Sequence, residues 1–241
     1  MIPDRLSKQN GLESEVSIEG RNVLLQGTLS VPERASAIVL FAHGSGSSRH
    51  SPRNRYVAHV LQSQGIATLL FDLLTGAEES IDESTGELRF NIRFLAERLI
   101  GATQWVMQRP DLQDFGIGYF GASTGAGAAL VAASKLSDVV RAVVSRGGRP
   151  DLAGDALRAV EAPTLLIVGG DDEPVITMNR TALARLKCLE KKLVIVPSAT
   201  HLFAEPGALE EVARIAADWF VLHLALPVEP KLPRAARASL T

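Results

Sequence analysis

Short apolar runs, rich in β-branched residues, recur along the whole chain and are separated by polar segments. Most end at glycine, proline, aspartate or serine. Runs of this kind are typical of strands buried on both faces of a sheet. The first run alternates in part and ends at Pro32, which indicates an outer strand. The predicted strands cover residues 23–31, 37–42, 66–71, 116–120, 139–144, 164–168 and 193–196.

Helical patterns fill the gaps between these runs. The longest covers residues 90–108, where Phe94, Leu95, Leu99 and Trp105 form an apolar face. Further helices are predicted at 54–64, 124–136, 179–186 and 208–224. Because strand and helix alternate, we expect an α/β fold. Its sheet is mostly parallel, has about seven to eight strands and carries helices on both faces.

Composition and charge exclude several classes of protein. The 241 residues carry 25 Lys and Arg against 27 Asp and Glu, a formal net charge of -2. This balance gives no electrostatic reason to expect nucleic acid or an anionic membrane as partner. No run approaches 18 apolar residues, and the first ten residues do not form a secretory signal. With Cys188 as the single cysteine, we expect no internal disulfide and a cytoplasmic location.

The chain shows no internal repeat and no break in composition before residue 226. We therefore predict one domain over residues 1–225, followed by a tail over 226–241 that Pro227, Pro230 and Pro233 interrupt. The sequence leaves the oligomeric state open and allows a homodimer. No cluster of His, Cys, Asp and Glu has metal-ligand spacing, so we predict neither a metal nor a cofactor.

The pentapeptide G-A-S-T-G at 121–125 lies between a predicted buried strand and a helix of small residues. A tight strand-to-helix turn needs glycine on both sides of its central residue, here Ser123. Such a turn places the serine hydroxyl at the carboxyl edge of the sheet and at a helix N-terminus, which favours developing negative charge. The pattern predicts a nucleophile.

A serine nucleophile needs a base, and the base needs an orienting carboxylate. His201 follows the last predicted strand and is the candidate base. Asp171 and Asp172 follow the strand before it, and Asp151 is a third candidate for the acid. The order serine, aspartate, histidine along the chain matches one known triad order and differs from those of the two serine-protease folds.

The glycine-rich turn H-G-S-G at 43–46 also follows a predicted strand. Acyl transfer creates an oxyanion, which backbone N–H groups can stabilise by about 3 kcal/mol each. We assign the two donors to Ser45 and Thr124, with Gly46 as the alternative to Ser45.

The chain resembles the α/β-hydrolases and is similar to dienelactone hydrolase-like proteins over roughly 16–224. The motifs that carry the resemblance are HGSG at 43–46, GASTG at 121–125, GGDDEPV at 169–175 and ATHLF at 199–203. The resemblance implies an α/β-hydrolase fold and places the acid at the fourth position of G-x-x-D-x-x-V, which is Asp172. The enzyme that names the family uses cysteine where this chain has Ser123, so we expect ordinary ester hydrolysis.

Two segments are candidates for shaping substrate choice. An acidic insertion at 73–91 either rims the pocket or forms a solvated loop. Arg49, Arg53 and Arg146 lie near the predicted site and suit a carboxylate or phosphate on the substrate. The segment 146–162 is too short for a large lid domain.

We predict an enzyme that cleaves a small ester or lactone through an acyl-enzyme, with Ser123 as nucleophile, His201 as base and Asp172 as orienting acid. Perhydrolysis or thioester cleavage on the same triad are alternatives within acyl chemistry. A catalytically weak binding or accessory module is the alternative from another class, since this fold also serves as a ligand receptor.

Overall fold

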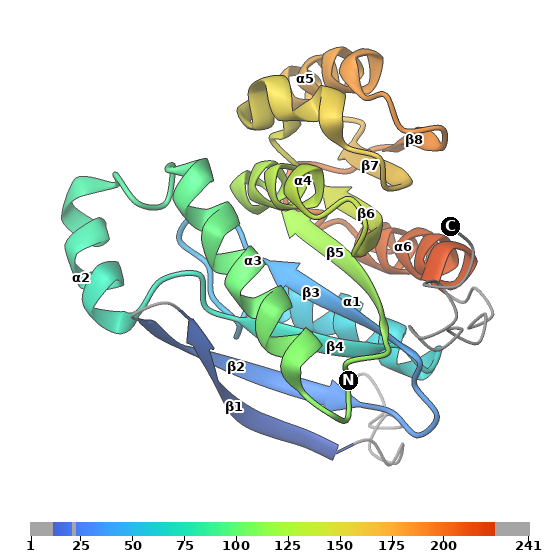
Figure 1. Ribbon diagram of the computed structural model, residues 1–241. Coiled ribbons are helices and arrows are strands. Elements are labelled where there is room, and N and C mark those ends of the chain that lie inside the picture. The colour runs from blue at the N-terminus through green and yellow to red at the C-terminus, as the bar shows by residue number, and fades with distance from the viewer. Residues whose placement is uncertain (1–11, 21–22, 225–241) are drawn as a thin grey trace, which may run out of the picture.

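The computed structural model describes residues 12–20 and 23–224, which form an eight-stranded sheet in the order β1-β2-β4-β3-β5-β6-β7-β8 (Figure 1). Strands β1 and β2 are antiparallel to each other, and β2 is antiparallel to β4. Strands β3 to β8 all run parallel. Their bounds are β1 (Leu12–Gly20), β2 (Val23–Val31), β3 (Ala37–Ala42), β4 (Ala67–Phe71), β5 (Gly116–Ala122), β6 (Val140–Arg146), β7 (Thr164–Gly169) and β8 (Lys191–Val196).

Helices cover both faces of this sheet. On one face α3, α4 and the 3-10 segment η1 pack over the larger apolar cluster, and on the other α1 and α6 pack against each other and the strands. Helix α2 stands apart at the left of Figure 1, between β4 and α3. The bounds are α1 (Pro52–Ser63), α2 (Gly76–Thr85), α3 (Ile92–Gln108), α4 (Thr124–Lys135), η1 (Pro150–Ala159), α5 (Glu173–Arg185) and α6 (Ala208–Leu224).

The seven predicted strands and five predicted helices are confirmed, but strand β1 escaped prediction. Its sequence, LESEVSIEG, reads as polar because three of its nine residues are glutamate. Of the whole strand only Ile18 is buried. A charged strand at a sheet edge discourages pairing with another chain, so the polarity suits its position.

Two helices also differ from expectation. Helix α2 forms within the acidic insertion, capped at its start by Thr75 and Glu78 and at its end by Gly86. The spacing Thr-x-x-Glu is a capping box, a signal that could have predicted this helix. Helix α5 begins at Glu173, six residues earlier than predicted, because Pro174 suits a first helical turn.

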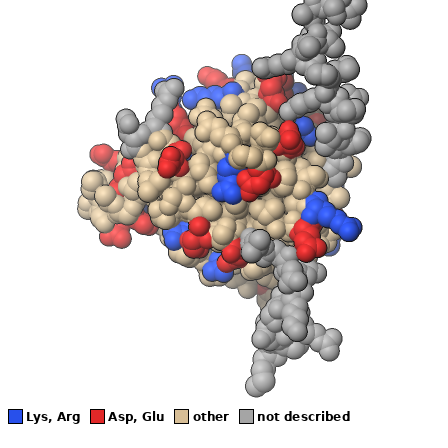
Figure 2. Space-filling view, turned by 60° about the horizontal axis from the view of Figure 1, so that its bottom comes forward, with Lys and Arg blue, Asp and Glu red and all other residues tan. Residues whose placement is uncertain are grey.

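All turns that carry candidate chemistry lie at one edge of the sheet. Because β3, β5, β7 and β8 run parallel, the segments after them emerge at the same side, where open α/β sheets bind ligands. The predicted tail at 226–241 lies outside the described residues, and one domain over 1–225 stays a prediction. Figure 2 shows basic and acidic side chains interspersed over one face, without a broad patch of either sign.

Candidate active site

Ser123 occupies the sharp turn between β5 and α4 with φ 51° and ψ −121°, a conformation that side chains other than glycine's rarely adopt. The flanking glycines are required sterically. A Cβ at position 121 would lie 2.5 Å from Cα of Ala126, and one at position 125 would collide with the carbonyl oxygen of Ala42. The turn predicted from the pentapeptide is therefore present, and its strain holds Ser123 at the sheet edge.

His201 and Asp172 meet at this edge. Nδ1 of His201 lies 2.7 Å from Oδ2 of Asp172, and the two side chains are 39% and 14% exposed. The carboxylate accepts the Nδ1 proton, which leaves Nε2 as a proton acceptor. Asp171 instead uses its backbone N–H to bind the Ala199 carbonyl, and Asp151 pairs with Arg149. Of the three candidate acids, Asp172 is the one bound to the histidine.

The serine and histidine converge on the end of β6. The N–H of Ser123 donates to the carbonyl of Arg146 at 3.2 Å. The next residue, Gly147, adjoins His201, because a Cβ there would lie 3.6 Å from Cε1 of the ring. No direct Ser123–His201 hydrogen bond is present among the residues described, as is common for catalytic pairs without substrate.

The glycine-rich turn after β3 packs directly on the serine turn. A Cβ at Gly44 would come within 3.0 Å of Cβ of Ser123. The N–H of Ser45 donates to Oγ1 of Thr124 at 3.0 Å, so it is engaged in the structure. Gly46, the alternative donor, has φ 66°. Thr124 is the first residue of α4, where an N–H has no partner within its own helix.

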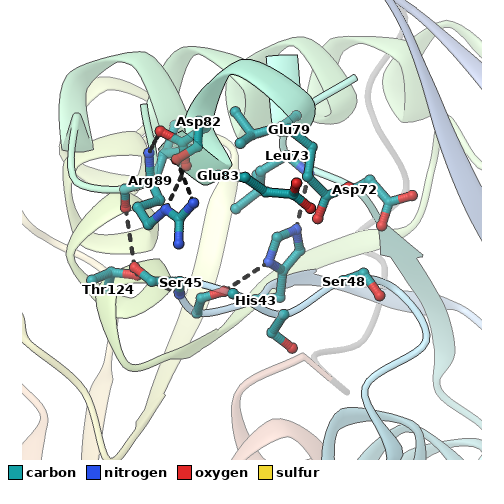
Figure 3. A pocket seen from close by; sticks show the side chains of 15 residues that line it. His43, Ser45, Ser48, Asp72, Leu73, Glu79, Asp82, Glu83, Arg89 and Thr124 are labelled. Carbon is teal, nitrogen blue, oxygen red and sulfur yellow. Dashed lines mark hydrogen bonds and ion pairs between the residues drawn. The ribbon is translucent and has the colours of Figure 1, made fainter. Parts of the chain in front are cut away.

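A cavity of about 170 Å³ opens beside this turn (Figure 3). Its wall joins the turn after β3 and Thr124 to residues of α2 and the segments flanking it. The acidic insertion thus rims a pocket rather than forming a solvated loop. Four carboxylates line the cavity, of which Asp72 and Asp82 are paired with arginines: the acids are Asp72, Glu79, Asp82 and Glu83.

His43 fastens the turn to the following strand. Its Nδ1 lies 3.0 Å from the Gly44 carbonyl, and its Nε2 accepts the N–H of Leu73 at 3.0 Å. The ring is therefore neutral, with its proton on Nδ1. Burial lowers the pKa of His43, against smaller opposing effects of the Gly44 carbonyl and of Asp72 and Glu79. The imidazole has a structural part, and the chemistry of this turn belongs to its backbone.

Three arginines are candidates for binding substrate, and the structure separates Arg49 from the other two. The Arg49 guanidinium pairs with Asp72 and reaches Glu15 at 3.5 Å, and its N–H donates to Asp72 Oδ1 at 2.8 Å. Its charge is thus neutralised by the protein itself.

Arg146 and Arg53 have no carboxylate partner among the described residues. Arg146 is only 6% exposed, donates to Oδ1 of Asn54 at 3.2 Å and stacks 5.9 Å from the ring centre of Phe203. Burial and the charge of Arg53 lower the pKa of Arg146 to about 10. Two neighbouring cations without a counterion are costly to bury.

This geometry agrees with comparisons to known proteins. The model of the dienelactone hydrolase family matches residues 25–222. The chain belongs to the dienelactone hydrolase family. A crystal structure of a dienelactone hydrolase from Anabaena variabilis is 60% identical, covers 90% of this chain and 100% of its own, and has a TM-score of 0.88. An esterase from Pyrococcus furiosus, 18% identical over 93% of this chain and 95% of its own, has the same fold with a TM-score of 0.74.

Relatives in Mycobacterium tuberculosis complicate the functional picture of this dienelactone hydrolase family member. Proteins from two strains, each named "Putative phosphoribosyl transferase", are 57% identical over 217 residues, 89% of this chain. The chain spans only 47% of their length, about half. Within residues 12–20 and 23–224, no helix of this family member is long and apolar enough to cross a membrane.

Sequence reasoning missed several residues around the site. Asp82 and Arg89 join α2 to the turn after β3, and Asn54 and Phe203 contact the buried Arg146. The Thr75–Glu78 capping box would have placed Asp82 on a helix, but no sequence signal indicates which side chains meet across the sheet edge.

Proposed function

We propose that this member of the dienelactone hydrolase family is a serine hydrolase that cleaves small carboxylic esters or lactones. The family and its esterase neighbours support hydrolase activity. The observation that carries the finer proposal is the 2.7 Å hydrogen bond between Asp172 and His201, beside a serine on a strained strand-to-helix turn. This is the arrangement that serine acyl transfer needs.

The reaction then follows in two halves. Ser123 Oγ attacks the substrate carbonyl while Nε2 of His201 takes its proton, and Asp172 stabilises the imidazolium. The oxyanion binds the N–H groups of Thr124 and of Ser45 or Gly46, and its collapse expels the alcohol with the proton from His201. Water, deprotonated by His201, next attacks the acyl-enzyme. The acid leaves, and the proton returns to Ser123.

The unpaired arginines favour substrates that carry a negative charge. Arg53 and Arg146 lie behind the serine turn and lack a counterion within the described part of the chain. A substrate carboxylate would supply one, because guanidinium groups bind such groups in a bidentate way. The opposite rim, with Glu79 and Glu83, would repel the same charge, so we expect the anionic group to face α1.

Other chemistries remain as alternatives. Perhydrolysis and thioester cleavage would use the same three residues, whereas a binding module would not need them in register. Phosphoribosyl transfer is suggested by the name of relatives twice as long. Pyrophosphate release from phosphoribosyl pyrophosphate and a nucleobase, independent of Ser123, would favour that activity over the hydrolase.

Labelling with a fluorophosphonate probe, followed by mapping of the modified peptide, tests the proposal directly. We expect the label on Ser123. Hydrolysis of p-nitrophenyl acetate should fall by about 10⁴-fold or more in Ser123→Ala. Ser134→Ala, on the same helix α4 but ten residues further on, is the matched control and should act like wild type. Equal rates for Ser123→Ala and wild type would refute the role of Ser123.

A further inference from the structure

Ser45 is held between two segments that are distant in the sequence. Its Oγ lies 3.0 Å from Oγ1 of Thr124 on one side and 3.3 Å from the carbonyl oxygen of Arg89 on the other (Figure 3). Its backbone N–H also donates to Thr124 Oγ1 at 3.0 Å. The residue therefore bridges the helix that follows Ser123 and the segment that follows α2.

These contacts fix where each proton lies. The Arg89 carbonyl can only accept, so the Ser45 hydroxyl donates to it. Ser45 Oγ then accepts the proton of the Thr124 hydroxyl, whose lone pairs remain for the N–H of Ser45. Thr124 Oγ1 thus holds this N–H in place at rest. An oxyanion, as a charged acceptor, binds an N–H more strongly than a neutral hydroxyl does and can take it over.

The position of the Arg89 carbonyl depends in turn on Asp82, near the end of α2. Oδ1 of Asp82 accepts the N–H groups of Leu88 at 2.6 Å and Arg89 at 3.2 Å, and Oδ2 accepts Nε of Arg89 at 2.6 Å. The Arg89 guanidinium also binds the Asp82 carbonyl. Burial by itself would raise the pKa of Asp82, but these hydrogen bonds outweigh it and the pKa is lowered. Asp82 is an ionised, 2% exposed anchor for the segment.

We propose that Asp82 and Arg89 are positioning residues for the oxyanion hole. They place the carbonyl that orients the Ser45 hydroxyl, and this hydroxyl, through Thr124, aligns the backbone of the turn beside the nucleophile. The inference rests on the proposed hydrolase function. It gives α2 a part in transition-state stabilisation in addition to lining the pocket.

Asp82→Asn tests this inference against a matched control in the same helix. Loss of a whole oxyanion donor costs about 10²–10³-fold in kcat, so a donor that is only displaced should cost about tenfold, with KM within about twofold of wild type. Glu78→Gln is the control, because it weakens another attachment of α2, the ion pair of Glu78 with Arg98. Its kcat should match wild type.

A second set of variants keeps the inference testable if Asp82→Asn does not fold. Ser45→Ala retains the backbone N–H but loses the bridging hydroxyl, and Thr124→Val loses the resting acceptor. Both should lower kcat with little change in KM, and Thr124→Ser should recover most of the kcat lost in Thr124→Val. Affinity for a trifluoromethyl ketone, which forms an oxyanion on the serine, should fall in parallel with kcat/KM.

Wild-type kcat in both Asp82→Asn and Ser45→Ala, in an enzyme that Ser123→Ala inactivates, would overturn the positioning role and leave the hydrolase intact. The same would follow if Asp82→Asn and Glu78→Gln lost equal activity, since the effect would then come from loosening α2 as a whole. Full activity in Ser123→Ala would instead refute the proposed function.

Discussion

Nδ1 of His201 lies 2.7 Å from Oδ2 of Asp172, whereas the neighbouring Asp171 binds the backbone of the histidine loop. The pairing orients the imidazole so that its other nitrogen is free to accept a proton. It separates two adjacent aspartates that the residue pattern alone leaves as alternatives.

This pairing predicts different outcomes for the two aspartates. Asp172→Asn should lower kcat by about 10⁴-fold, because an amide favours the wrong histidine tautomer. Asp171→Asn, the matched control one residue away, should stay within a few-fold of wild type. Steady-state hydrolysis of p-nitrophenyl acetate measures both. A larger loss in Asp171→Asn would transfer the role of acid to Asp171.

The strained backbone at Ser123 predicts a separation of activity from stability. Ser123→Gly should abolish hydrolysis and raise the free energy of unfolding by about 1 kcal/mol, because glycine adopts φ 51° without strain. Ser123→Ala should abolish hydrolysis without this gain, since alanine keeps the Cβ. Urea unfolding of the three proteins measures the difference. Equal stabilities for the glycine and alanine variants would show that the turn is not strained.

The buried imidazole of His43 predicts acid sensitivity. Its pKa is lowered by burial below the ordinary 6.5, so near and below this pH the unfolded chain takes up a proton that the folded protein does not. The free energy of unfolding should therefore be full above pH 6.5 and decline as the pH falls. His43→Gln should flatten this slope.

A control separates His43 from the other histidines. His223, whose pKa burial also lowers, contributes a slope of the same sign that remains in the His43 variant. His59 is exposed, so His59→Gln should keep the wild-type slope. Urea denaturation at a series of pH values measures all three proteins, and an unchanged slope in His43→Gln would contradict the assignment.

The unpaired arginines predict a preference for anionic esters. Arg53→Gln or Arg146→Gln should raise KM about tenfold for an ester with a free carboxylate, such as p-nitrophenyl hemisuccinate, and leave KM for p-nitrophenyl acetate unchanged. Arg55→Gln is the matched control, because Arg55 lies on the same helix α1 but is half exposed. Equal kcat/KM for the two esters, unchanged in the variants, would rule out the preference.

Much of the fold follows from the sequence. The apolar runs predict seven of the eight strands, because buried parallel strands need apolar side chains on both faces. Strand β1 and helix α2 escape this logic, since each has a mostly polar sequence and contributes little to the core. Their stability comes from pairing with β2 and from caps and ion pairs, which hydrophobic patterning does not reveal.

The candidate site divides in the same way. The sequence by itself determines the turn at Ser123, because only glycine fits at positions 121 and 125, and it sets the order serine, aspartate, histidine along the strand ends. Only the tertiary structure decides that Asp172 binds His201, that Asp72 neutralises Arg49 while Arg146 stays unpaired, and that Asp82 reaches the turn at Ser45 through Arg89. These contacts join segments far apart in the chain, and their geometry depends on how neighbouring strands end at the sheet edge.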